Sequence, residues 1–97
     1  MKRVRQFMRQ YPDSRSALTE WAKVVKDATW ASIQDTRKVF PHADAVTVKS
    51  GRTATVFNIR GNNYRLIVAI HYNTQLVFVM RFITHKEYNR DIWKDTL

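Results

Sequence analysis

Hydrophobic residues in the first forty positions recur at the spacing of an α-helix. The pattern between residues 2 and 11 ends at Pro12, and a second helix is expected from a cap at Asp13 or Ser14 to about Ala28. A third, shorter helix is expected to end before Pro41. The apolar residues that define the three stripes are Val4, Phe7, Met8 and Tyr11, then Leu18, Trp21, Val25 and Ala28, and lastly Trp30, Ile33, Val39 and Phe40.

After Asp44 the pattern changes from helical spacing to the alternation of β-strands. β-Branched and aromatic residues dominate the segments 46–48, 53–59, 64–72 and 76–83. Short polar turns at 61–63 and 73–75 predict antiparallel pairing of neighbouring strands. Thr84 and Glu87 have the spacing of a capping box and therefore predict a helix start.

The order of these elements predicts an α+β fold in a single domain covering residues 1–97. Helices at about 2–40 are expected to pack on one face of a small antiparallel sheet at about 46–83. A short C-terminal helix is expected at about 85–95. The chain is long enough for one hydrophobic core and too short for two separate domains.

Two arginines on neighbouring strands are the main candidates for chemistry. If Leu66, Val68 and Ile70 face the helices together with Leu76, Phe78, Met80 and Phe82, the opposite face carries Arg65 and Arg81. This arrangement requires a three-residue turn at 73–75 that pairs Tyr72 with Leu76, because a two- or four-residue loop would put the arginines on opposite faces. Asn58 and Arg60 are placed on the arginine face on the same condition.

The excess of positive charge indicates a negatively charged partner. The chain has 17 Lys and Arg against 8 Asp and Glu, a formal net charge of +9, which predicts attraction to nucleic acid, an anionic membrane surface or an acidic protein. There is no cysteine, so disulfide and thiol chemistry are excluded. The longest apolar run, 66–70, is too short to span a bilayer, and the N-terminus lacks a signal-peptide core. A cytoplasmic location without membrane partners is therefore expected.

Guanidinium groups match phosphate oxygens in a bidentate manner, so the arginine face is a candidate phosphate site. His85 lies at its edge and could transfer a proton. Each residue also has a plainer interpretation: the arginines as solvated charges, His85 as a surface residue, and Tyr88 as a core residue beside Trp93. No metal-binding motif is present, so no metal site is expected.

The chain resembles the HigB-type toxins of bacterial toxin–antitoxin modules, which belong to the RelE/ParE superfamily. The resemblance covers nearly the whole chain and is carried by ordered motifs: 56–59 (VFNI), 61–67 (GNNYRLI), 77–79 (VFV) and 84–88 (THKEY), with 11–13, 21–26, 28–30 and 39–44 in the amino half. It implies a RelE-like fold. Family members usually begin with a short β-strand, whereas this chain opens almost directly with a helical pattern. Either the sequence starts inside the domain or that strand is missing, and a missing strand would leave a sheet edge exposed.

The resemblance implies an mRNA interferase, a small basic endoribonuclease that cleaves mRNA in the A site of the 70S ribosome. Such a toxin is held inactive by a cognate helix-turn-helix antitoxin. It implies neither metal nor other cofactor, because the 2′-OH of the substrate is the nucleophile and the product is a 2′,3′-cyclic phosphate.

The resemblance also implies roles for individual residues. Arg65 and Arg81 would stabilise the transition state, and His85 would act as general acid or general base. Tyr88 would stack on a base of the RNA or serve as the second proton-transfer group. Further RNA contacts are expected from Arg60, Asn62, Lys86, Lys49 and Arg52.

A non-enzymatic function remains the alternative. The ParE branch shares the fold but poisons DNA gyrase, and an RNA- or ribosome-binding module would use the same basic surface. The pair His85 and Tyr88 near the arginines favours the nuclease, because a pure binder would not need a titratable group there.

Overall fold

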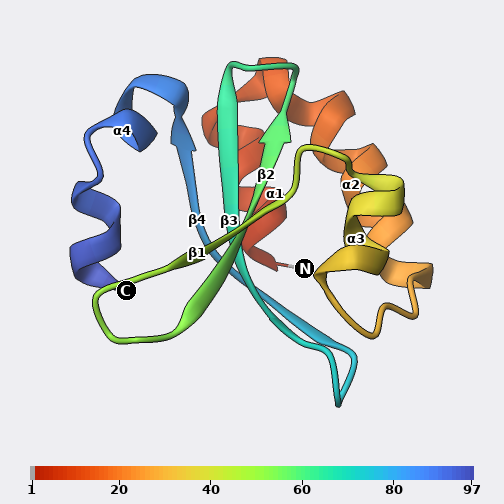
Figure 1. Cartoon of the computed structure of the whole chain (residues 1–97). Coiled ribbons are helices and arrows are strands. Elements are labelled where there is room, and N and C mark those ends of the chain that lie inside the picture. Colours follow the sequence, from red (N-terminus) through yellow and green to blue (C-terminus); the bar gives the residue numbers. More distant parts are fainter. Residues whose placement is uncertain (1) are drawn as a thin grey trace.

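A four-stranded antiparallel sheet is the centre of the fold in the computed structural model, which describes residues 2–97 (Figure 1). The strands follow one another as a meander in the order β1-β2-β3-β4, so β1 and β4 are its edges, and no strand precedes α1 in the described residues. The strands are β1 (Asp44–Thr47), β2 (Thr53–Ile59), β3 (Tyr64–His71) and β4 (Leu76–Thr84). The α-helices are α1 (Lys2–Gln10), α2 (Arg15–Asp27), α3 (Ile33–Val39) and α4 (His85–Asn89), with 3-10 helices η1 (Pro12–Ser14) and η2 (Ile92–Thr96). The predicted α+β class is confirmed.

The three N-terminal helices cover one face of the sheet (Figure 1) and enclose the main core. Leu18 and Trp21 of α2 are almost completely buried against Phe57 of β2 and Leu66 of β3. The Phe57 ring meets Trp21 edge-on at 5.5 Å between centroids. The stripes predicted from helical spacing therefore hold α1–α3 on the sheet, except at Val39, which is 50 % exposed at the end of α3.

The predicted cap of α2 is wrong. Ser14 occupies the N-cap position, but its hydroxyl donates to the Tyr11 carbonyl at 2.7 Å instead of accepting from the helix. Its backbone already has helix-like angles (φ −91°, ψ −4°), whereas a capping side chain usually acts from an extended residue. Asp13 instead accepts a hydrogen bond from the Tyr64 hydroxyl at 2.7 Å. The segment 12–14 thus leads into α2 as a 3-10 turn and ties it to the sheet.

The opposite face of the sheet carries a second, smaller core. Val56 and Ile67 are buried there beneath Trp93 of η2. The C-terminal segment is not one helix over 85–95, as the sequence predicts, because Asp91 adopts a left-handed conformation (φ 62°) between α4 and η2. This break turns the chain back, so that Trp93 covers the sheet.

The β3–β4 connection differs from the prediction. His71 pairs with Leu76, which leaves four residues in the loop, so the predicted three-residue turn pairing Tyr72 with Leu76 is wrong. Further along, Ile67 faces Arg81 while Val68 faces Val79, and Met80 is therefore an extra residue in β4. A β-bulge at Met80 shifts the register that the loop establishes.

The bulge reverses the facing of β4 along its length. Before it, Val77 and Val79 pack on the helices, while Phe78 is 52 % exposed on the other face. After it, Phe82 returns to the main core. The prediction that Leu76, Phe78 and Met80 join Phe82 against the helices is therefore wrong.

The same bulge places Arg65 and Arg81 on one face of the sheet, as predicted. Arg65 faces Ile83 and Ile67 faces Arg81, and directly opposite residues share a face of the sheet. Arg65 and Arg81 therefore lie on the same face as diagonal neighbours, although the four-residue loop alone would have separated them.

Candidate active site at the start of α4

The end of β4 and the start of α4 form a rigid junction beside the β2–β3 turn. Thr84 caps α4 as predicted: its Oγ1 accepts from the Glu87 backbone N–H at 3.2 Å, and Glu87 Oε1 accepts from the Thr84 N–H at 3.2 Å. The His85 N–H donates to the Asn63 carbonyl at 2.9 Å. These bonds hold the His85 side chain against the turn that precedes Arg65.

Arg65 is the centre of the site and is only 8 % exposed. Its guanidinium donates to the carbonyls of Asn62 (3.3 Å) and Tyr64 (3.2 Å), to Asn62 Oδ1, and to His85 Nδ1 (3.0 Å). None of the ion pairs between described side chains includes Arg65. A buried cation without a carboxylate partner keeps its charge available for an anionic ligand.

The Arg65 contact determines the tautomer of His85. A guanidinium has no acceptor, so His85 Nδ1 accepts and the ring proton sits on Nε2. Nε2 lies 3.1 Å from Asn89 Nδ2, one helical turn later. Because both of these nitrogens are then donors, we assign the Asn89 amide in the reverse orientation, with its oxygen accepting from Nε2. His85 is therefore held at both nitrogens, which fixes the direction in which it can exchange a proton.

Tyr88 connects this cluster with the second core. Its ring lies under the Arg65 guanidinium at 5.4 Å and stacks on Trp93 at 5.3 Å with planes inclined by 18°. The Trp93 indole N–H donates to the Tyr88 carbonyl at 3.1 Å. Burial raises the pKa of the Tyr88 hydroxyl, and the Asp44 carboxylate raises it further. Tyr88 is thus a packed residue beside Trp93 and also a phenol that keeps its proton next to Arg65.

The structure brings Asn58 to the same face, directly opposite Arg65, and leaves it exposed. Arg81 points away from the cluster: its guanidinium donates to the Met80 carbonyl at 3.0 Å and to Thr96 Oγ1 at 3.4 Å. The predicted placement of Arg60 with Arg65 is wrong, because a positive φ of 53° breaks the strand alternation. Arg60 instead pairs with Asp13 at 3.4 Å.

The remaining predicted RNA contacts lie at different distances from the cluster. Asn62 belongs to it through its two contacts with Arg65, and the exposed Lys86 follows His85 on α4. Lys49 and Arg52 belong to the β1–β2 connection, whereas Arg65 follows the β2–β3 turn at the other end of β2.

The predicted packing of Tyr88 beside Trp93 is confirmed, but sequence reasoning missed Asn89 and the position of Trp93 over Val56 and Ile67. The spacing of Asn89 from His85, i and i+4 on one helix, is a signal that could have identified it. The role of Trp93 depends on the left-handed residue Asp91, which has no comparable sequence signal. Among residues 2–97 no three His, Asp or Glu side chains come together to hold a metal ion, and none of the described helices is long and apolar enough to cross a membrane.

Comparisons with known proteins agree on one family. Residues 14–91 match the family model described as HigB_toxin, RelE-like toxic component of a toxin–antitoxin system. The chain is similar to "mRNA interferase HigB" of Escherichia coli O6:H1, with 29% identity over 82 residues, which cover 84% of this chain and 78% of that protein. It is also similar to "mRNA interferase toxin HigB" of Escherichia coli strain K12, with 24% identity over 91% of this chain and 83% of the relative.

Proposed function

The chain belongs to the HigB toxin family, the RelE-like toxic components of toxin–antitoxin systems, and from this premise we propose that it is an mRNA interferase. Relatives that it covers over most of their length carry that name. The observation that carries the proposal to particular residues is the contact of 3.0 Å between the Arg65 guanidinium and His85 Nδ1. It joins a cation without a carboxylate partner to a group that can transfer a proton.

The proposed reaction is cleavage of the RNA backbone by its own 2′-OH, without a metal ion. The 2′-oxygen loses its proton to a general base and attacks phosphorus, the P–O5′ bond breaks, and O5′ takes a proton from a general acid. The products are a 2′,3′-cyclic phosphate and a 5′-OH.

The cluster offers a group for each need of this reaction. Arg65 stabilises the charge that develops on the phosphate, and His85 is one of the two proton-transfer groups. The Tyr88 hydroxyl is a candidate for the second, since its raised pKa keeps the proton in place until it is needed.

The proposed substrate is mRNA in the A site of the ribosome, and the proposed regulator is a cognate helix-turn-helix antitoxin. The positive balance of the chain supports a polyanionic substrate. All eight Asp and Glu residues lie outside residues 45–86, so β2, β3 and β4 themselves carry no side-chain carboxylate.

In vitro translation with mapped mRNA ends tests the proposal. Cuts that appear only when ribosomes translate the message, in phase with codons, support it. A 2′-deoxy substitution at the scissile nucleotide should abolish the cut at that position, because the nucleophile is missing. Intact mRNA together with inhibited DNA supercoiling would refute the proposal in favour of a gyrase poison.

A further inference from the structure

A second surface, at the β4 edge of the sheet, has the composition of a site for a nucleobase and its phosphates. It is a groove of about 610 Å³ near the β3–β4 hairpin, lined by Arg3, Arg52, Ala69, His71, Val77, Phe78, Val79 and Met80. This size lies within the range of roughly 300–1,000 Å³ that is usual for small-molecule sites. Nothing in the reaction proposed above uses it.

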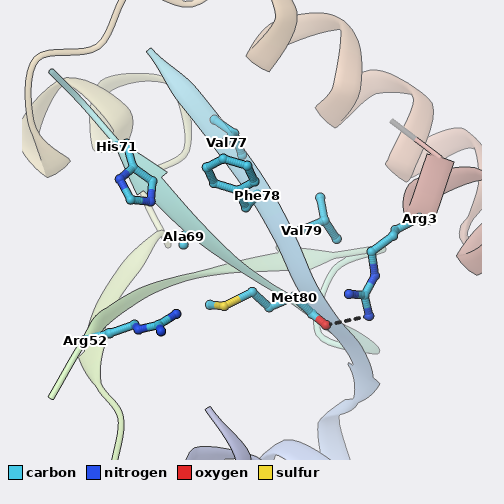
Figure 2. A pocket seen from close by; sticks show the side chains of 8 residues that line it. All are labelled: Arg3, Arg52, Ala69, His71, Val77, Phe78, Val79 and Met80. Carbon is cyan, nitrogen blue, oxygen red and sulfur yellow. Dashed lines mark hydrogen bonds between the residues drawn. The ribbon is translucent and has the colours of Figure 1, made fainter. Parts of the chain in front are cut away.

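The exposed Phe78 ring is the main feature of this groove. Phe78 is 52 % exposed because the bulge at Met80 turns it away from the helices. The His71 ring meets it edge-on at 5.3 Å, with planes inclined by 89°. Figure 2 shows the two rings side by side at the hairpin end of β3 and β4. The His71 contact steadies the Phe78 ring, which leaves a flat aromatic face to the solvent.

The charged side chains that line the groove, Arg3 and Arg52, are both positive. Figure 2 shows the Arg52 side chain extending from the β1–β2 connection toward the Met80 side chain. Arg3 approaches from α1 and donates to the Met80 carbonyl at 2.9 Å. No acidic residue lines the groove. An aromatic platform flanked by guanidinium groups is the usual composition of a site for single-stranded nucleic acid.

The groove and the candidate active site lie at opposite ends of β3, with the second core between them. Along β3, Arg65, Ile67, Ala69 and His71 alternate on one face, so Arg65 and His71 are about 20 Å apart at the rise of a strand. Arg81 lies between them on β4, directly opposite Ile67. A single-stranded RNA of a few nucleotides is long enough to span this distance, and it would pass outside the C-terminal segment that covers Ile67.

We propose that the groove at Phe78 is a second RNA-binding subsite, in which an unpaired base stacks on Phe78 and its phosphate contacts Arg52. The proposal rests on the proposed function for the identity of the polymer. It gives the RNA a direction along the sheet, from the cleavage site at His85 toward the β3–β4 hairpin. An RNA strand is favoured over a protein partner because the apolar ring sits among cations and the chain carries a large positive excess.

Binding of a fluorescently labelled, unstructured RNA oligonucleotide tests the subsite. The full chain carries His85→Ala as a background, so that cleavage does not interfere, and anisotropy gives the dissociation constant. Phe78→Ala should weaken binding on the order of tenfold, as expected for the loss of one stacked base, while Phe78→Trp should retain it. The matched control is Val39→Ala, which removes an apolar side chain of 50 % exposure on α3, and it should leave the dissociation constant unchanged.

A salt series tests the phosphate contact. Arg52→Gln should reduce the slope of log K against log salt concentration by about 0.7, the value for one phosphate contact with a single strand. Unchanged binding by Phe78→Ala, or equal weakening by Phe78→Ala and Phe78→Trp, would overturn the stacking proposal. A Phe78→Ala defect that appears only as a loss of self-association in sedimentation would also overturn it and identify the face as a contact between copies.

Cleavage measurements separate this proposal from the proposed function. If the chain with native His85 does not cut RNA, the nuclease assignment fails, whatever Phe78 does to binding. If cleavage depends on Arg65 and His85 while binding ignores Phe78, only the subsite fails.

Discussion

Replacement of Trp93 by alanine should both destabilise the protein and slow the proposed cleavage. Trp93 is 6 % exposed, stacks on Tyr88 and packs over Val56 and Ile67. Truncation of a buried aromatic residue costs about 3–5 kcal/mol. The lower value applies here, because the site lies near the C-terminus and the neighbouring chain can collapse into the space. At 4–8 °C per kcal/mol for a domain of this size, the melting temperature should fall by roughly 12–24 °C.

The cleavage rate should fall as well, even at temperatures where the variant stays folded, because the Tyr88 ring loses the surface that holds it under Arg65. Trp93→Phe keeps an aromatic ring but removes the indole hydrogen bond to the Tyr88 carbonyl, which is worth about 1 kcal/mol. Its melting temperature and cleavage rate should therefore lie between those of the wild type and of Trp93→Ala. Ile92→Ala is the control, since Ile92 is 62 % exposed and the change should be worth less than about 0.5 kcal/mol. Thermal melting and single-turnover cleavage measure both effects. A Trp93→Ala protein that melts within a few degrees of the wild type and cleaves normally would refute the role assigned to the indole.

Three further predictions concern stability. Thr84→Ala removes the side-chain oxygen that caps α4 and should cost about 1 kcal/mol in denaturant unfolding, whereas Thr84→Ser should cost little; equal losses would show that the hydroxyl does not cap the helix. The hydrogen bond to Asp13 raises the pKa of Tyr64 above its ordinary 10.0, so the folded state retains this proton longer than the unfolded state, and stability should decline as pH rises above 10. Tyr64→Phe should make that alkaline decline shallower, and an identical pH profile would contradict the linkage. Leu18→Ala opens a cavity in the main core and should cost about 2–5 kcal/mol by the same unfolding assay, while a loss below 1 kcal/mol would mean that α2 packs differently.

The helical half of the fold follows from the sequence because each helix has one apolar stripe and the main core uses it. The stripe residues Leu18, Trp21 and Val25 are all buried. The capping box at Thr84 is equally local, since the two partners lie three residues apart. The cap of α2 is equally local but could not be predicted, because the 3-10 turn at 12–14 already gives Ser14 helix-like backbone angles.

The facing of β4 could not be predicted, because residues 76–80 and 82–83 are apolar on both faces of the strand. When both faces of a strand are apolar, the alternation of polar and apolar residues does not determine its register. The sequence therefore indicates neither the four-residue loop nor the bulge at Met80. The four-residue loop and the bulge each shift the register by one residue, and the two shifts cancel at Arg81. The prediction that Arg65 and Arg81 share a face is therefore correct, although the turn on which it was based is not. Phe78 lies between the two shifts and is exposed as a result.

In the candidate site, too, some residues could be predicted from the sequence and others could not. Arg65 and His85 could be predicted, because the first alternates within a strand and the second follows a helix cap. Arg60 could not, since its left-handed conformation turns it toward Asp13. Asn89 becomes relevant only when the tautomer of His85 is considered.

The central claim is that Arg65 and His85 together form the centre at which RNA is cut. The most direct test is the single-turnover cleavage rate of Arg65→Ala and His85→Ala on ribosome-bound mRNA, with Lys38→Ala on the exposed face of α3 as the matched cationic control. Removal of a proton-transfer group typically costs roughly 10²–10⁴ in rate. We expect each of the two site variants to lose at least about 100-fold in rate at a temperature where it is folded, and we expect no loss for Lys38→Ala. Arg65→Ala should also melt below the wild type, because it removes a buried side chain that donates to two backbone carbonyls. Rates of both site variants within a few-fold of the wild type would place the chemistry elsewhere in the molecule.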